Sequence, residues 1–161
     1  MSEVYTFVDP VPQKGGVVVA EVSNAGYTQF LVDGRHKNLF ADEGASVGGA
    51  DKGPEPYELL LMALGSCTSI TLRMYANRHQ WPLDRIVITL RHTRVHPVDS
   101  ANCEKEVRRI ERIERTIALR GKLTGEQKQH LLALADRCPV HQTLTSKVEF
   151  VTKLDESEPI P

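Results

Sequence analysis

The chain lacks an excess of charge of either sign, a long apolar run and an even set of cysteines. Its 20 Lys and Arg nearly balance its 21 Asp and Glu, so no general basic field would attract nucleic acid or an anionic membrane. The longest apolar stretch, residues 59–64, is far too short to span a bilayer. No apolar run follows a basic start near the first residue. We therefore expect a cytoplasmic protein with no membrane or nucleic-acid partner.

Three cysteines in 161 residues do not form the paired framework of a small secreted domain. In a reducing compartment each free cysteine is either inert packing or a reactive thiol. The length fits one domain that can bury a hydrophobic core without the help of disulfides or bound metal ions. We assign residues 1–154 to a single domain and residues 155–161, which are acidic and contain proline, to a flexible tail.

The first third of the chain predicts a small antiparallel sheet. Residues 16–22 and 27–32 are rich in β-branched and aromatic side chains, and a turn signal lies between them. A tight turn at residues 33–34 would return the chain as a third strand over residues 35–41. The connection that follows, residues 44–56, is rich in Gly and Pro, as are loops that lie on the surface or line a site.

Residues 57–79 predict the main helix. Pro56 suits its first turn, and Glu58 suits the positive end of the helix dipole. The first half is apolar almost all round, which predicts a central, buried helix. Gly65 and Ser66 would permit a kink or the close approach of a neighbour.

The second half predicts two long strands and a final one. Residues 85–96 alternate in polarity. Residues 109–119 fit either helical spacing or alternation, and we favour a strand because Gly121 and a new helix start follow directly. Residues 146–153 alternate again and predict the last strand.

The second helix begins at a capping box, in which Thr124 and Gln127 match the pattern T-x-x-Q. It should reach about Asp136 and stop near Cys138, because the residue before Pro139 avoids the α region. The predicted order is β-β-β-α-β-β-α-β, an α+β fold with mostly antiparallel pairing.

Cys67 and Cys138 each extend a core-facing row on a predicted helix. The rows are Leu60, Leu64 and Met74 for the first helix, and Leu131 and Leu134 for the second. Two core-facing helices in a small domain often pack together, so the two thiols could meet. Free cysteine also serves as a small buried hydrophobe, so inert packing stays an alternative. Cys103 lies in a polar stretch, and we interpret it as incidental.

A metal site is a further alternative at Cys138 and His141, whose spacing can seat two zinc ligands. A closed zinc site needs two more ligands at matching spacing, and the sequence offers no second pair. We expect no metal and no bound cofactor.

Two segments together resemble the OsmC/Ohr family of osmotically induced and organic hydroperoxide resistance proteins. They are GPEPYELLLMALGSCT at residues 53–68 and DRCPVH at residues 136–141. The resemblance covers nearly the whole chain and is nearer to the broad OsmC-like branch. It implies an intertwined homodimer, with central helices packed between antiparallel sheets built by both subunits.

The resemblance also implies roles for the cysteines. Cys67 would attack a small organic hydroperoxide, and Cys138 would resolve the product as a disulfide. An arginine and a glutamate would activate the first thiolate, for which we select Arg35 and Glu58. Tyr57 occupies the position after the motif proline, where the family's reductases have the glutamate, so Glu58 is displaced by one residue. Arg73 and Arg137 are alternatives for the arginine.

The chemistry needs such partners because a free thiol, with a pKa of about 8.5, is mostly protonated near neutral pH. The electrons would come from an external dithiol, which the resemblance suggests is a lipoylated protein. Candidate apolar walls that favour organic peroxides are Phe40, Leu60, Leu61, Met62 and Leu64. Two rival functions stay open, namely a dimer that binds a small lipophilic ligand without catalysis, and a slow redox sensor.

Overall fold

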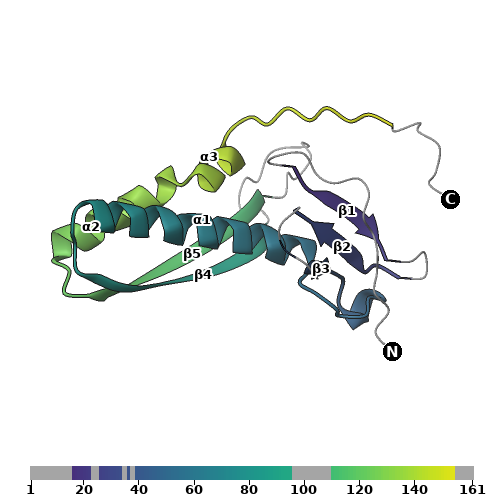
Figure 1. The fold of residues 1–161 in the computed structure, drawn as a ribbon, viewed down its shortest axis with the longest axis horizontal. Coiled ribbons are helices and arrows are strands. Elements are labelled where there is room, and N and C mark those ends of the chain that lie inside the picture. The colour runs from purple at the N-terminus through teal and green to yellow at the C-terminus, as the bar shows by residue number, and fades with distance from the viewer. Residues whose placement is uncertain (1–15, 23–25, 34–35, 37–38, 96–109, 155–161) are drawn as a thin grey trace, which may run out of the picture. The chain divides into compact units, whose positions relative to one another are not determined.

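The computed structural model describes residues 16–22, 26–33, 36, 39–95 and 110–154. Figure 1 shows the elements, which in chain order are β1 (Val18–Glu21), β2 (Gln29–Val32), β3 (Leu39–Ala41), η1 (Ala45–Val47), α1 (Pro56–Arg78), β4 (Leu83–Val95), β5 (Ile110–Gly121), α2 (Gly125–Leu134), η2 (Ala135–Arg137) and α3 (Pro139–Thr145). Two compact units are present, residues 1–62 with 92–112 and residues 63–91 with 113–161. The single domain over residues 1–154 stays a prediction, and residues 155–161 lie outside the described residues.

The first unit contains an antiparallel sheet of order β1-β2-β3. Phe30 on β2 faces Phe40 on β3, with ring centroids 5.5 Å apart, which is the cross-strand aromatic contact that stabilises such a sheet. The predicted N-terminal sheet is therefore confirmed, although its strands are shorter than the sequence pattern predicts. Part of the predicted hairpin turn lies outside the described residues.

A buried carboxylate organises the Gly-rich connection after β3. Asp42 is 2% exposed and accepts hydrogen bonds from the Thr28 hydroxyl at 2.9 Å and from the backbone amides of Glu43, Ala50 and Lys52. Burial alone would raise the pKa of Asp42, but these hydrogen bonds outweigh burial and hold the pKa below its ordinary value. The loop is thus held by its own backbone amides around one negative charge.

Helix α1 confirms the main helix prediction, with Pro56 as its first residue. Its buried residues recur every fourth position, at Leu64, Thr68, Leu72 and Ala76. The predicted core row is right at Leu64, which is buried, and wrong at Met74, which is 67% exposed. Leu60 and Cys67 in that row are partly buried. The first half of α1 is apolar almost all round and has no polar face to show which side is buried, so sequence periodicity could not select the row there.

The second unit holds the core. Its buried members are Leu72, Ala76, Leu83, Leu123, Leu131 and Ala135, and the side chains packed against them include Tyr75, Trp81, Ile86, Ile117, Leu119 and Leu134. Helix α1 approaches β4 closely at Gly65, where a Cβ would lie 2.9 Å from Cδ1 of Leu90. This contact agrees with the predicted need for a small residue at Gly65.

The choice of a strand over a helix for residues 109–119 is confirmed by β5, which pairs with β4 in a two-stranded sheet. The capping box is also confirmed, since Thr124 Oγ1 accepts from Gln127 N and the Gln127 side chain accepts from Thr124 N. Helix α2 ends at Leu134 and continues as the 3-10 turn η2. The extended backbone of Cys138 then ends this helical segment, as the proline that follows it predicts.

Two predictions for the C-terminal part fail. Helix α3, which begins at Pro139, was not expected. The final strand predicted over residues 146–153 is wrong, because residues 147–154 form no strand in the described chain and follow α3 as an extended stretch in Figure 1. Alternation gives a segment the side-chain pattern of a strand, but a strand also needs a neighbouring edge that completes its hydrogen bonds.

Among the described helices, α1 alone is long and apolar enough to span a membrane by length and composition. Its residues Leu72 and Ala76 belong to the core cluster, and the Thr68 hydroxyl contacts Cys138. These contacts are those of a helix packed on other elements of its own chain.

Candidate functional site

The two cysteines of the sequence motifs come together in the second unit. Cys138 is fully buried between η2 and α3, and Cys67 on α1 is partly exposed. The Cys67 side chain is close enough to be one of the groups that lower the pKa of the Cys138 thiol. Residues far apart in the chain therefore form a thiol pair that has one buried and one accessible member.

Thr68 and Arg115 complete this cluster. The Thr68 hydroxyl lies 3.4 Å from Cys138 Sγ, and Arg115 Nη1 donates to Thr68 Oγ1 at 3.1 Å and to the carbonyl oxygen of Ala135 at 3.2 Å. Arg115 Nη2 donates to Asp136 Oδ1 at 2.6 Å. The side chain of Arg115 is 13% exposed and that of Asp136 is 66% exposed, so the cation is the less solvated partner.

The sulfur of Cys138 also caps α3. Its Sγ accepts from the backbone N of His141 at 3.4 Å, and the His141 ring lies 3.8 Å from Asp136 Oδ1. Burial alone would raise the pKa of the Cys138 thiol, because it disfavours the charged form. Hydrogen bonds from Thr68, His141 and Cys67, with the charge of Arg115, outweigh burial and lower the pKa of Cys138.

Sequence reasoning missed Thr68 and Arg115. The usable signal was the alternation of β5, where Ile113, Arg115, Ile117 and Leu119 occupy one face and are all partly buried. A charged residue on the inward face of a strand requires a buried partner, which marks it as a candidate for a site. Thr68 carried no separate signal, because a threonine within an apolar helix commonly bonds its own helix backbone, as Thr68 does to the Leu64 carbonyl at 2.8 Å.

The other predicted residues lie elsewhere or outside the described part. Arg35 and Cys103 belong to segments that the structure does not describe. Glu58 belongs to the first unit, and its carboxylate accepts from the backbone N of Glu55 at 3.0 Å. The assignments of Arg35 and Glu58 to the Cys67 thiolate stay predictions.

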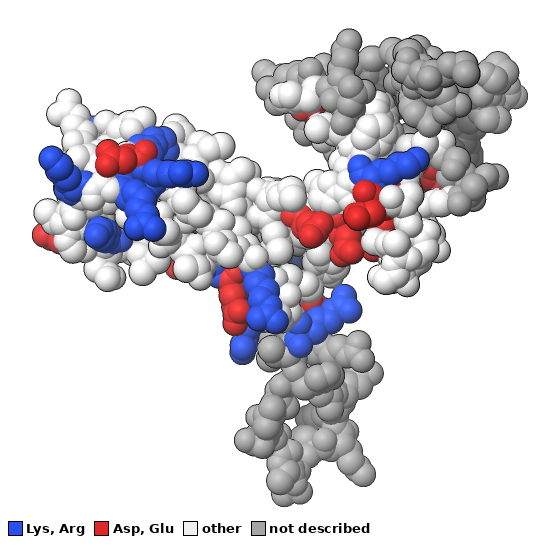
Figure 2. Space-filling view, turned by 90° about the horizontal axis from the view of Figure 1, so that it is seen from below, with Lys and Arg blue, Asp and Glu red and all other residues white. Residues whose placement is uncertain are grey.

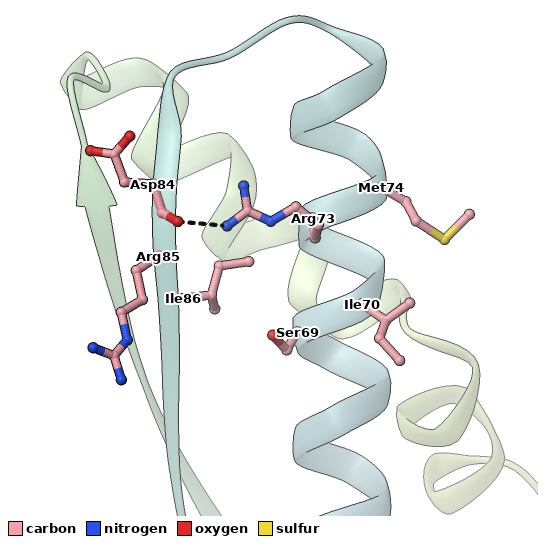
Figure 3. Close-up of a pocket in the computed structure, with 7 residues that line it drawn as sticks. All are labelled: Ser69, Ile70, Arg73, Met74, Asp84, Arg85 and Ile86. Carbon is pink, nitrogen blue, oxygen red and sulfur yellow. Dashed lines mark hydrogen bonds between the residues drawn. The ribbon is translucent and has the colours of Figure 1, made fainter.

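The alternative arginines do not join the thiol pair in any described hydrogen bond. Arg73 donates from α1 to the carbonyl oxygens of Leu83 and Asp84, and thereby ties the helix to the start of β4. Figure 3 shows the hydrogen bond to Asp84. Arg137 is exposed on η2. Tyr57, at the family's glutamate position, stacks on His92 with ring centroids 4.4 Å apart.

A shallow groove of about 350 Å³ lies between α1 and β4. Figure 3 shows its lining, which is Ser69, Ile70, Arg73 and Met74 from α1 and Asp84, Arg85 and Ile86 from β4. No residue of the thiol cluster lines the groove. Of the predicted apolar walls, Leu64 is buried, Leu60 and Leu61 are partly buried, and Met62 is exposed.

No group of three or more His, Cys, Asp or Glu in the described segments is placed to hold a metal ion. On the face seen in Figure 2, basic and acidic side chains lie beside each other with uncharged surface between them. The chemistry that the cluster supports is that of a thiol pair with a nearby, mostly buried cation.

The chain has similarities to known proteins over most of its length. The sequence profile described as OsmC-like protein matches residues 49–153, more than half of the chain. No curated protein matches the sequence.

Several solved structures share the fold. An organic hydroperoxide resistance protein OsmC from Legionella pneumophila is 18% identical, with a TM-score of 0.55, over 80% of this chain and 87% of that one. An OsmC-like protein from Mycoplasma pneumoniae is 18% identical, with a TM-score of 0.59, over 80% and 83%. The organic hydroperoxide resistance protein OhrB of Bacillus subtilis is 18% identical, with a TM-score of 0.55, over 83% and 91%. These likenesses show the α+β fold, and with the profile match they establish that the chain belongs to the OsmC family.

Proposed function

We propose that the protein reduces organic hydroperoxides through its thiol pair, with Cys67 as the nucleophile and Cys138 as the resolving thiol. The observation that carries this proposal is the proximity of the two thiols, since the Cys67 side chain is one of the groups that lower the pKa of the buried Cys138 thiol. Cys67 is the partly exposed member of the pair, so it is the one that a peroxide can reach. The names of the Legionella and Bacillus structures agree with this class of substrate.

The reaction follows from the chemistry of the two thiols. The Cys67 thiolate attacks the terminal peroxide oxygen, so that an S–O bond forms, the O–O bond breaks and an alcohol leaves. Cys138 then attacks the Cys67 sulfenic acid, an S–S bond forms and water is released. Prompt disulfide formation protects Cys67 from irreversible oxidation. Prompt formation requires that the two thiols lie in contact.

The reaction needs an external reductant and, in our proposal, a partner subunit. A dithiol, such as that of a lipoylated protein, would exchange with the disulfide and restore both thiols. A homodimer would cover apolar side chains that the single chain leaves in solvent, among them Ile70 and Met74 on α1 and Phe150, which is 86% exposed. We place this dimer in the cytoplasm, where free thiols persist.

The test is intact mass under non-reducing, denaturing conditions after a stoichiometric dose of cumene hydroperoxide. We expect the mass to fall by the amount that the formation of one disulfide removes. Peptide digestion should map this disulfide to Cys67 and Cys138. Cys67→Ser should abolish peroxide consumption, whereas Cys103→Ser should not. Equal consumption by the wild type and Cys67→Ser would refute the mechanism.

The same experiment, repeated with an added dithiol, separates the rival functions. A disulfide that forms once but is not turned over by dithiols would favour a slow redox sensor. Thiols that stay unchanged, or that reach the sulfonic acid slowly without a disulfide, would favour a dimer that binds a small lipophilic ligand.

A further inference from the structure

Arg115 holds two segments of the chain at once. From β5, its Nη1 donates to Thr68 Oγ1 on α1 at 3.1 Å and to the Ala135 carbonyl oxygen on η2 at 3.2 Å. Its Nη2 donates to Asp136 Oδ1, also on η2, at 2.6 Å. We call these three contacts the Arg115 bridge. A guanidinium is planar and carries its donors in a fixed fork, so the bridge sets the place of both segments relative to one side chain.

The two bridged segments are those that carry the thiols. Thr68 directly follows Cys67 on α1, and Cys138 directly follows η2. The Thr68 hydroxyl also lies 3.4 Å from Cys138 Sγ, so the bridge spans the place where the second thiol meets α1. Among the described hydrogen bonds of Arg115, none ends on a sulfur atom. Arg115 therefore acts on the segments around the thiols, and closing a disulfide breaks none of its contacts.

The turn that carries Cys138 is shaped by its own backbone, but its local hydrogen bonds do not attach it to α1. Cys138 has an extended backbone between η2 and α3, its backbone N donates to the Ala135 carbonyl oxygen, and its Sγ accepts from His141 N. Among the described hydrogen bonds, those that link this turn to α1 are the contact of Thr68 with Cys138 Sγ and the Arg115 bridge. The bridge is thus a main polar link between the two thiol segments.

The bridge is strongest on its buried side. Thr68 and Ala135 are fully buried, and the side chain of Arg115 is 13% exposed. Hydrogen bonds from a charged donor are stronger than those between neutral groups, and here little water competes for the donor. Asp136 is mostly in solvent, so its contact with Arg115 adds little. The contacts that matter for the thiols are therefore those to Thr68 and Ala135.

We propose that Arg115 is a positioning residue that holds Cys67 and Cys138 at the spacing from which their disulfide closes. A disulfide requires an S–S bond of about 2.05 Å and a narrow range of dihedral angles, so a small shift of the turn takes the attacking sulfur out of reach. The kinetic consequence, faster resolution of the Cys67 sulfenic acid, rests on the proposed function. The equilibrium consequence concerns the thiol pair alone and needs no peroxide.

The equilibrium with dithiothreitol gives the first test, in proteins that also carry Cys103→Ser. Reduced dithiothreitol passes two electrons and two protons to the Cys67–Cys138 disulfide and becomes its own cyclic disulfide. We expect Arg115→Gln to lower the equilibrium constant for disulfide formation by at least roughly tenfold, since a misplacement of about 1 Å can cost about 100-fold. A tenfold loss raises the reduction potential by about 30 mV. An unchanged constant would overturn the proposal.

Matched variants separate the bridge from charge and from general stability, with circular dichroism used to verify that each variant is folded. Arg115→Lys keeps the charge but loses the fork, so its constant should resemble that of Arg115→Gln. Arg120→Gln changes an exposed arginine on the same strand, and Leu83→Ala weakens the core outside the bridge, so both should stay near the wild type. A wild-type constant in Arg115→Lys, or a loss in Leu83→Ala equal to that in Arg115→Gln, would overturn the proposal.

Single-turnover reactions with cumene hydroperoxide give the second test. Once Cys67 is a sulfenic acid, either Cys138 closes the disulfide with release of water, or a second peroxide gives the sulfinic acid and a second alcohol. In Arg115→Gln we expect the rate of closure, relative to the rate of sulfenic acid formation, to fall by at least roughly tenfold. Sulfinic acid at Cys67 should then appear at peroxide doses at which the wild type forms only the disulfide.

The two tests fail in different ways. Sulfenic acid formation that slows as much as closure in Arg115→Gln would place Arg115 in the activation of Cys67 and overturn the positioning role. A wild type that does not react with peroxide, but whose equilibrium with dithiothreitol shifts in Arg115→Gln as expected, would refute the proposed function and support the positioning role.

Discussion

Removal of the buried cation should cost stability in the reduced protein, quite apart from catalysis. The perturbation is Arg115→Ala, which deletes donors to Thr68, to the Ala135 carbonyl and to Asp136. The contact with Asp136 contributes little, at most about 1 kcal/mol, because that carboxylate is mostly in solvent. The two contacts on the buried side are hydrogen bonds from a charged donor, which contribute about 1.5–3 kcal/mol each. They share one side chain and do not add fully, so we expect a loss of about 2–4 kcal/mol.

The assay is urea denaturation of the fully reduced protein, with the midpoint and the slope fitted separately. Arg120→Ala is the matched control, since Arg120 is an exposed arginine on the same strand, and its loss should fall within about 0.5 kcal/mol. Asp136→Asn should lower the free energy of unfolding by no more than about 1 kcal/mol. An Arg115→Ala variant that is no less stable than Arg120→Ala would refute the reasoning that places a buried cation in this network.

Three further predictions concern the fold. Leu72→Ala should lower the free energy of unfolding by about 2–5 kcal/mol, because it leaves a cavity at a fully buried position, and the exposed Leu132→Ala should change it far less. Thr124→Ala should cost about 1 kcal/mol in the same denaturation assay, because it removes the cap of α2. The pKa of Asp42 is lower in the folded chain, so its contribution to stability is present above the unfolded-state pKa of about 3.9 and is lost as the pH falls through the folded value. Denaturation measured between neutral and acid pH should show this loss in the wild type, and an unchanged profile in Asp42→Asn would contradict it.

The sequence by itself determined the local structure. Helix α1, the long strands and the capping box at Thr124 follow from patterns within a few residues of each other, where periodicity and hydrogen bonding act along the chain. The break at Cys138 follows from the proline after it. The resemblance to the family motifs also singled out Cys67 and Cys138, although it could not show which other side chains surround them.

Tertiary structure decided which side chains meet. The first half of α1 is apolar almost all round and small polar residues follow it, so packing against β4, β5 and α2 selects Thr68, and not Met74, for the buried row. Arg115 on β5 hydrogen-bonds the Thr68 hydroxyl beside Cys138, and no spacing along the chain encodes that contact. The stretch after α3 has the pattern of a strand, yet whether it forms one depends on a neighbouring edge. Contacts between distant segments arise from the shared burial of surfaces, which is a property of the folded chain and not of any short segment within it.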